Sequence, residues 1–97
     1  MLLLARFRIY GHSMEPIIKN GDVVLLSVIP YLFSKPKTSN IVAFIDKKSK
    51  KFFIKRINKI NRDKFFVKGD NEEDSLDSRK FGWIEKKEIV GKVIRNL

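Results

Sequence analysis

Short apolar runs separated by turn signals are the feature that most limits how this chain can fold. The runs, rich in Val, Ile, Leu and Phe, lie at residues 4–10, 23–26, 41–45, 51–59, 65–67 and 88–94. Each has the length of a strand, and polar or glycine-containing turns separate them. Residues 30–36, bracketed by prolines, are expected to form a loop. Elsewhere in the chain we expect at most one helical turn, near residues 14–19 or 85–88. The pattern predicts a mainly β fold of five or six short antiparallel strands.

The length of the chain allows one domain, which we place at residues 1–97. Apolar residues make up 43% of the sequence, which is too many for a disordered segment. There is no cysteine, so disulfides and thiolate sites are excluded. His12 is the only histidine, which leaves no material for a histidine metal cluster. We therefore expect no metal and no cofactor.

The net charge of +10 predicts attraction to anionic partners such as nucleic acid, acidic lipid or acidic protein. Lysines and aromatic residues alternate between residues 35 and 68, as they do in some basic nucleic-acid-binding sheets. The simpler interpretation is that the lysines cover the solvated faces of strands. A binding module for nucleic acid or acidic lipid, without catalysis, is thus the main alternative to an enzyme.

No segment of the sequence is apolar enough to cross a bilayer. A spanning helix needs about 20 apolar residues, whereas the longest run, Met1 to Ala5, ends at Arg6. The run is also too short for a signal peptide and lacks a basic segment before it. We expect a chain without a transmembrane anchor, whose residues 30–33 either contact a bilayer interface, with Lys35 and Lys37 on acidic headgroups, or pack on the sheet.

Ser13 is the candidate nucleophile, and a serine hydroxyl needs a neighbouring base. In an extended segment adjacent side chains point to opposite faces, so His12 is expected to face away from Ser13. Lys55 is the better candidate. The two-residue period of a strand places it between Phe53 and Ile57 on an apolar face, with Arg56 on the opposite face.

A lysine can act as a base near pH 7 only when its amine is neutral. From a reference value of about 10.4, this requires the pKa to fall by roughly 3 units, or about 4 kcal/mol. Loss of water on an apolar strand face can provide that shift.

Three blocks of sequence resemble the catalytic domain of bacterial-type type I signal peptidases in residue type, spacing and order. They are Ser13-Met14-Glu15-Pro16 with Gly21-Asp22-Val23-Val24-Leu25, then Ile54-Lys55-Arg56-Ile57, then Gly69-Asp70-Asn71 with Ser75-Leu76-Asp77-Ser78-Arg79-Lys80-Phe81-Gly82. The resemblance implies a compact β fold, shared with self-cleaving repressors, and a serine endopeptidase with a Ser-Lys dyad. Such an enzyme removes signal peptides or propeptides from precursor proteins by cutting after small residues.

The resemblance also assigns roles to individual residues. Ser13 becomes the acylated nucleophile and Lys55 its general base, oriented by Ser75 and supported by an ion pair between Asp77 and Arg79. The Ser13 backbone N–H is one oxyanion donor. The residues expected around the oxyanion and the substrate are Gly11, His12, Met14, Pro16, Phe53 and Ile54. Asp70 and Asn71 are expected to be turn formers.

The sequence departs from the family pattern at several positions. Several bacterial members carry a serine two residues before the nucleophile, which gives a second oxyanion donor, whereas this chain has Gly11. The extra β domain and the N-terminal anchor of larger members are missing, so a short member lacking an anchor is expected. The resemblance implies a membrane-associated, extracytoplasmic location, with a soluble cytoplasmic protein as the alternative. A self-cleaving repressor is disfavoured because only twelve residues precede Ser13.

Overall fold

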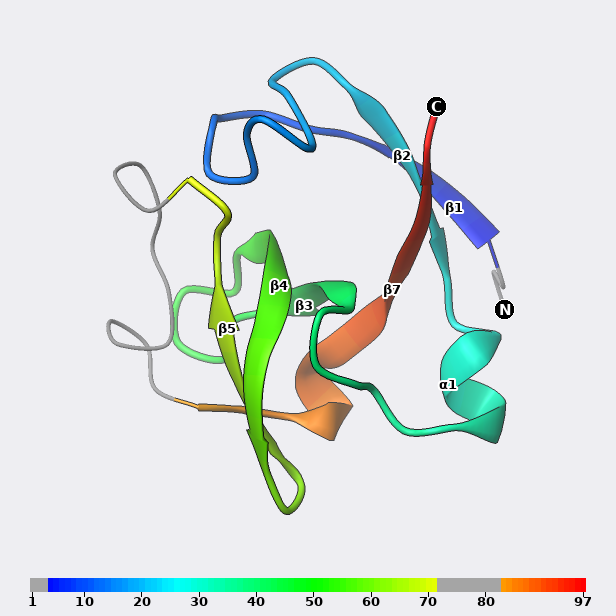
Figure 1. Ribbon diagram of the computed structural model, residues 1–97, viewed down its shortest axis with the longest axis vertical. Coiled ribbons are helices and arrows are strands. Elements are labelled where there is room, and N and C mark those ends of the chain that lie inside the picture. The colour runs from blue at the N-terminus through cyan, green and yellow to red at the C-terminus, as the bar shows by residue number, and fades with distance from the viewer. Residues whose placement is uncertain (1–3, 72–82) are drawn as a thin grey trace.

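The computed structural model describes residues 4–71 and 83–97, which form one antiparallel sheet curled on itself (Figure 1). Its strands are β1 (Leu4–Arg8), β2 (Val23–Ser27), β3 (Ile41–Ile45), β4 (Phe52–Asn61), β5 (Lys64–Lys68), β6 (Ile84–Glu85) and β7 (Ile89–Asn96). They lie side by side in the order β1-β2-β7-β3-β4-β5-β6. Two short helical turns lie between strands of the described chain: α1 (Pro30–Phe33) between β2 and β3, and η2 (Lys86–Glu88) between β6 and β7. The prediction of a mainly β fold is confirmed.

Two local predictions need correction. The described residues contain seven strands, because the two-residue strand β6 pairs with β5 and was too short to be seen as an apolar run. The segment at residues 30–36, expected to be a loop, begins with the helix α1. Pro30 stands in its first turn, where its missing N–H costs nothing, and the Ser34 N–H closes the helix on the Pro30 carbonyl at 3.1 Å.

Irregular pairing along the ladders accompanies the curl of the sheet. The register shifts between Leu25 and Leu26 in the β2–β7 pair, and between Ala43 and Phe44 in the β3–β7 pair. An extra residue in one strand bends it and increases its twist. At Gly91 of β7 a Cβ atom would lie 3.0 Å from the Ser27 carbonyl oxygen, so a side chain here would push β7 away from its partner β2 by a few tenths of an ångström.

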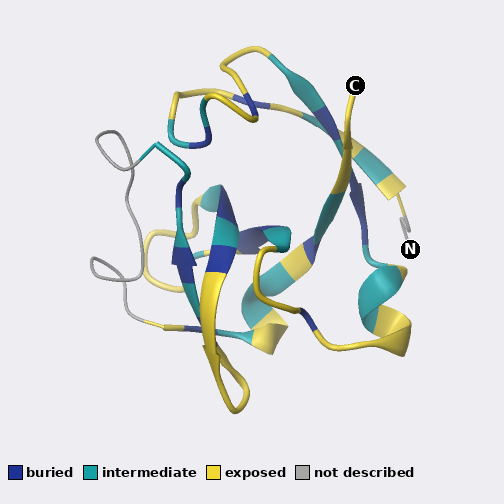
Figure 2. Cartoon of the chain, in the orientation of Figure 1, coloured by how far each residue is buried: buried dark blue, intermediate teal, exposed yellow. Residues whose placement is uncertain are grey.

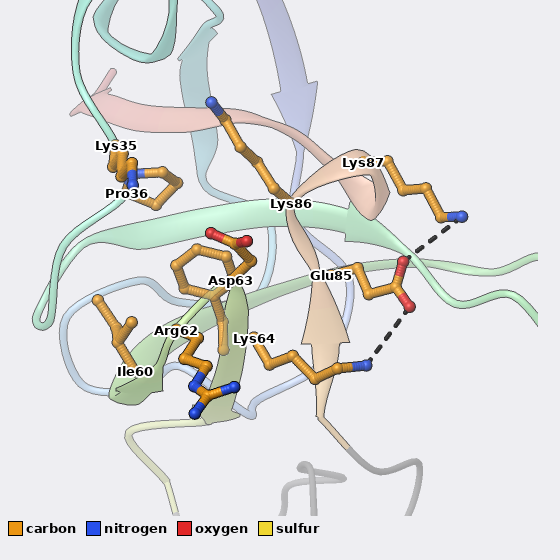
Figure 3. A pocket seen from close by; sticks show the side chains of 10 residues that line it. Lys35, Pro36, Ile60, Arg62, Asp63, Lys64, Glu85, Lys86 and Lys87 are labelled. Carbon is orange, nitrogen blue, oxygen red and sulfur yellow. Dashed lines mark hydrogen bonds and ion pairs between the residues drawn. The ribbon is translucent and has the colours of Figure 1, made fainter.

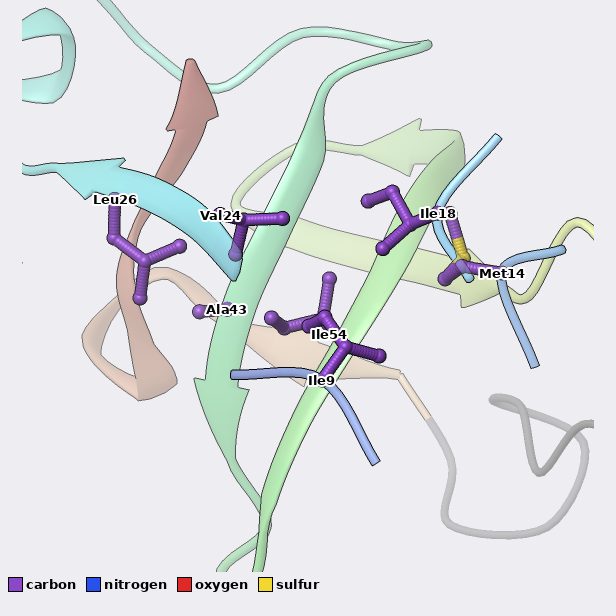
Figure 4. Close-up of a cluster of buried hydrophobic side chains, with 7 residues drawn as sticks. All are labelled: Ile9, Met14, Ile18, Val24, Leu26, Ala43 and Ile54. Carbon is purple, nitrogen blue, oxygen red and sulfur yellow. The ribbon is translucent and has the colours of Figure 1, made fainter. Parts of the chain in front are cut away.

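The apolar residues pack into two clusters, and their buried members are among the dark blue parts of the chain in Figure 2. One contains Ile9, Met14, Ile18, Val24, Leu26, Ala43 and Ile54 and is drawn in Figure 4. The other contains Val42, Phe44, Ile57, Phe65, Val67 and Ile84. β3 and β4 contribute to both clusters, so neither of their faces is fully open to solvent.

The curl brings the first strand against the fifth in the sheet order. β1 and β4 are not hydrogen-bonded neighbours, yet the rings of Phe7 and Phe52 lie with their centroids 4.3 Å apart. An aromatic pair of this kind adds about 0.5–1.5 kcal/mol to the burial of the two rings. The contact places the loop after β1, which carries Ser13, beside the strand that carries Lys55.

Candidate active site

Ser13 lies in the loop between β1 and β2, and its neighbours tie that loop to the core. Met14 and Ile18 are only 3% and 2% exposed and belong to the cluster of Figure 4. Burial of each such side chain contributes about 1.5–3 kcal/mol. Ser13 itself stays half-buried, so the core holds the backbone of the loop and leaves the serine at its surface.

Two glycines close this loop. Gly11 has a φ of +100° and Gly21 a φ of +89°, values that residues with a side chain rarely adopt. Around them the Ile9 N–H donates to the Asp22 carbonyl at 2.7 Å, and the Gly21 N–H donates to the Ile9 carbonyl at 2.8 Å. The Gly11 N–H is bound by the Asn20 side-chain oxygen at 2.8 Å. The backbone of the loop is therefore fixed on both sides of Ser13.

His12 is engaged by a carboxylate of its own loop. Its Nδ1 lies 2.7 Å from Glu15 Oε2, and its side chain is 56% exposed. This hydrogen bond lowers the pKa of the Glu15 carboxyl. The segment forms consecutive turns, not the extended chain from which its orientation was predicted, so that premise was wrong. The contact with Glu15 nevertheless turns the imidazole Nδ1 toward a partly exposed partner.

Lys55 is a buried lysine in the middle of the sheet. It is 3% exposed on β4, where it pairs with Val42 of β3. Its Nζ lies 6.0 Å from the centroid of the Phe53 ring. Lysine is almost never buried to this extent unless a partner or a function requires it, and Lys55 and Ser27 are the two polar residues buried in the described core.

Ser13 and Lys55 line the same small hollow, which has a volume of about 90 Å³. The remaining lining residues are Phe7, Ile9, Tyr10, Met14, Phe52, Phe53 and Ile54. They come from the end of β1, from the Ser13 loop and from the first half of β4. The hollow therefore places a serine and a lysine among apolar side chains, and these are two residue types from which a nucleophile and a base can be built.

An ion pair formed by Arg56, the neighbour of Lys55 in the chain, links β4 to the segment after β5. Arg56 Nε donates to Asp70 Oδ1 at 2.9 Å and its Nη2 donates to Asp70 Oδ2 at 2.8 Å. A third bond, from Arg56 Nη1 to the Ser39 carbonyl, measures 2.9 Å. The hydrogen bond to Asp70 raises the pKa of the guanidinium above its ordinary value. Asp70 is therefore an ion-pair partner, in addition to the turn former that the sequence predicted.

Asn71 binds the loop that carries Ser13. Its backbone N–H donates to the Ser13 carbonyl at 2.8 Å, and its side-chain Nδ2 donates to the His12 carbonyl at 3.1 Å. The Asp70 N–H adds a contact of 3.4 Å with Met14 Sδ. The Gly69-Asp70-Asn71 segment thus fastens the Ser13 loop to the β4–β5 hairpin.

The structure brings together only part of the predicted site. Met14, Phe53 and Ile54 line the hollow with Ser13 and Lys55, whereas Gly11, His12 and Pro16 are exposed and do not line it. The predicted supporting residues Ser75, Asp77 and Arg79 lie outside the described residues. The sequence reasoning missed Phe7, Ile9, Tyr10 and Phe52. Only the curl of the sheet places them here, although the aromatic character of Phe7 and Phe52 was a usable signal.

Residues 4–71 and 83–97 contain no group of three or more histidine, aspartate or glutamate side chains that could hold an ion. The same residues contain no helix that is both long and apolar enough to span a membrane.

Known proteins resemble this chain over most of its length. A family model described as "Signal peptidase, peptidase S26" matches residues 1–58 and 58–96. Signal peptidase IB of Staphylococcus aureus (strain Mu50 / ATCC 700699) is 25% identical over an alignment of 146 positions, gaps included, which covers 94% of this chain and 76% of that relative. The same protein of strain COL is 24% identical over the same coverage.

Another relative has a higher sequence identity over a shorter stretch of this chain. Signal peptidase I of Buchnera aphidicola subsp. Baizongia pistaciae (strain Bp) is 46% identical over 35 residues, which cover 36% of this chain and 11% of the length of that relative. Together with the family match, which covers nearly the whole chain, these similarities agree with the shared hollow of Ser13 and Lys55. The chain belongs to the signal peptidase family, peptidase S26, and is a serine-type hydrolase of that family.

Proposed function

We propose that the chain is a serine endopeptidase that removes signal peptides or propeptides from precursor proteins, with Ser13 as nucleophile and Lys55 as general base. The observation that carries the proposal is the hollow that these two residues line together, with Lys55 only 3% exposed. Family membership supplies the substrate class.

The chemistry needs Lys55 to be neutral at the start of the cycle. Burial penalises the protonated amine by several kcal/mol. A cation over the face of Phe53 gains only about 0.5–2 kcal/mol, and the distance of 6.0 Å lies at the limit of that interaction. Of these two effects burial is the larger, and it favours the neutral base.

The reaction then follows acyl transfer. Lys55 Nζ takes the proton of the Ser13 hydroxyl while Ser13 Oγ attacks the scissile carbonyl carbon. The resulting oxyanion accepts a hydrogen bond from the Ser13 backbone N–H. The tetrahedral intermediate collapses as the lysine ammonium gives its proton to the leaving amine. Water, activated by the same amine, releases the acyl group and restores the hydroxyl. In this proposal Ser75 orients the Lys55 amine, and Asp77 with Arg79 supports the site.

The dimensions of the hollow fit the cleavage specificity that the family resemblance implies. About 90 Å³ is well below the roughly 300–1,000 Å³ of pockets that enclose whole ligands. This small volume suits a subsite for one substrate side chain rather than a pocket for a whole ligand. We propose that the substrate binds as an added strand beside residues 11–13 and 53–55, with small residues at the first and third positions before the scissile bond.

Mass spectrometry of a signal-peptide library incubated with the protein tests the proposal. We expect cleavage after small residues, and complete loss of it in Ser13→Ala and Lys55→Ala. Lys59→Ala is the matched control, because Lys59 is an exposed lysine on the same strand that does not line the hollow. Cleavage that continues unchanged in both Ser13→Ala and Lys55→Ala would reject the dyad.

A basic groove at the far end of β4 from Lys55 supports a peripheral contact with acidic membrane, which we propose as part of the function (Figure 3). The groove has a volume of about 470 Å³, with Pro36, Ile60 and Phe65 among its lining residues. Its cations are Lys35, Arg62, Lys64, Lys86 and Lys87, against the two carboxylates Asp63 and Glu85. Glu85 already pairs with Lys64 and Lys87.

Apolar side chains of α1 precede this groove in the chain. Leu32 is 59% and Phe33 is 86% exposed, and Lys35 of the groove follows two residues later. Exposed apolar residues next to lysines are typical of surfaces that lie on acidic membranes. We propose that this contact holds the enzyme at the extracytoplasmic face, where precursors emerge.

Sedimentation with vesicles separates this contact from the alternative of a nucleic-acid-binding module. We expect binding to vesicles with acidic lipid, weaker binding to neutral vesicles, and a clear loss in Phe33→Ser. Salt-sensitive binding to nucleic acid that persists in Phe33→Ser, with no vesicle binding, would favour the alternative.

A further inference from the structure

We propose that the Asn71 side chain is a positioning residue that orients and polarises the peptide unit whose N–H serves the oxyanion. The inference rests on the proposed function. Asn71 Nδ2 donates to the His12 carbonyl at 3.1 Å. That carbonyl and the Ser13 N–H belong to the same trans peptide unit and point in opposite directions. A hydrogen bond on the carbonyl therefore fixes the direction in which the N–H points.

Asn71 holds the peptide units on both sides of the nucleophile. Its side chain binds the unit that joins His12 to Ser13, and its backbone N–H binds the next unit through the Ser13 carbonyl at 2.8 Å. Once both planes are fixed, the backbone dihedral angles of Ser13 are fixed as well. The oxyanion donor and the attacking hydroxyl are then preorganised together, which is the condition for effective electrostatic stabilisation.

The His12 carbonyl accepts a second hydrogen bond, from the Glu15 N–H at 3.2 Å. Both bonds withdraw electron density from the oxygen and make the N–H of the same unit a stronger donor, by about 10–30% per bond. This matters in a chain with Gly11, because glycine has no hydroxyl to give a second oxyanion donor.

The support of Asn71 is itself rigid. Asp70, the preceding residue, is held by two hydrogen bonds from Arg56, and its N–H contacts Met14 Sδ at 3.4 Å. Asn71 therefore reaches the His12 carbonyl from a backbone that is anchored on β4 and in the core.

Steady-state kinetics of Asn71→Ala and Asn71→Asp, with a peptide that the wild-type protein cleaves, tests the inference. We expect kcat to fall about tenfold in Asn71→Ala with KM unchanged, because the oxyanion exists only in the transition state. Asn71→Asp is expected to be slower still. It has the same size, but its carboxylate cannot donate and repels the carbonyl. Asn58→Ala, an exposed asparagine on β4, is the control and keeps wild-type rates.

A second readout does not depend on catalysis. In nuclear magnetic resonance spectra, the Ser13 amide nitrogen is expected to shift more than that of Ile18, in the same loop, when Asn71 becomes Ala or Asp. Kinetics equal to wild type in Asn71→Asp, or a Ser13 amide that does not respond, overturns the inference. If the wild-type protein cleaves no peptide, the proposed function fails, and the response of the Ser13 amide still decides whether Asn71 controls this peptide unit.

Discussion

The ion pair between Arg56 and Asp70 gives the sharpest test of how the site is held. Asp70→Asn keeps the shape of the side chain, removes its charge, and turns an amide NH₂ toward the guanidinium. Two bonds of 2.8 and 2.9 Å are affected, between side chains that are 33% and 19% exposed. Exposed pairs contribute up to about 1 kcal/mol, and breaking a buried pair costs roughly 3–5 kcal/mol.

This partly buried, bidentate pair lies between those limits, so we expect Asp70→Asn to cost about 2 kcal/mol of unfolding free energy. For a domain of this size that corresponds to a Tm lower by roughly 8–16 °C. Thermal and urea unfolding followed by circular dichroism measure both quantities. Lys64→Gln, which removes an exposed contact with Glu85 at 3.5 Å, is the control and is expected to change the free energy by less than about 0.5 kcal/mol.

A double-mutant cycle with Arg56→Gln isolates the pair itself. The loss in the double variant should be smaller than the sum of the two single losses by at least about 1 kcal/mol. If the two losses add within about 0.5 kcal/mol, the ion pair does not carry the stability assigned to it. In that case the Gly69-Asp70-Asn71 segment must be held by other contacts.

Three further predictions concern the loop and the sheet. Gly91→Ala places a Cβ 3.0 Å from the Ser27 carbonyl oxygen and should lower the unfolding free energy by about 1–3 kcal/mol, whereas Val90→Ala at an exposed position should cost less. In Gly11→Ser the new Cβ meets no atom within 4 Å, but the serine is forced to a φ of +100°. Chemical denaturation should show that the unfolding free energy falls by about 1–3 kcal/mol. An unchanged unfolding free energy would contradict the strain. Hydrogen bonds from the Lys19 N–H and the Asn96 side chain lower the pKa of Asp22, so its stabilising effect is present above the ordinary carboxyl range and disappears as the pH falls through the lowered pKa. As the pH falls through this range, the Tm of the wild type should therefore decrease more than the Tm of Asp22→Asn, which thermal unfolding at a series of pH values measures.

The strands could be predicted because each apolar run is long enough to form one strand and ends at a turn. The residues from Ile41 to Ile45 form β3 with the predicted bounds. The two-residue alternation of side chains along a strand placed Lys55 between apolar neighbours, and Lys55 is indeed buried. The four-residue helix α1 was missed because its proline was taken as a loop signal, although proline is favourable in the first turn of a helix.

The contacts that hold the site together could not be predicted, since they depend on register and curl. Arg56 pairs with Lys68 across the β4–β5 hairpin, which places Asp70 two residues beyond the paired position. The shift between Ile57 and Lys59 in that ladder is invisible in the sequence. A hairpin without the shift would present a different residue to Arg56. For the same reason the meeting of Phe7 with Phe52 follows only from the curled sheet.

The β4–β5 hairpin explains how this chain can hold Ser13 and Lys55, the proposed nucleophile and base, close together although they lie 42 positions apart. One of its strands carries Lys55, and the segment after the other carries Asn71, which binds the backbone of the Ser13 loop. Arg56 and Asp70 join these two parts directly beside the site. The two segments of the family match meet at Asn58, between this joined end and the turn of the hairpin. Because all of these contacts lie at one end of the hairpin, the other end is free to differ among relatives without moving Lys55 away from Ser13.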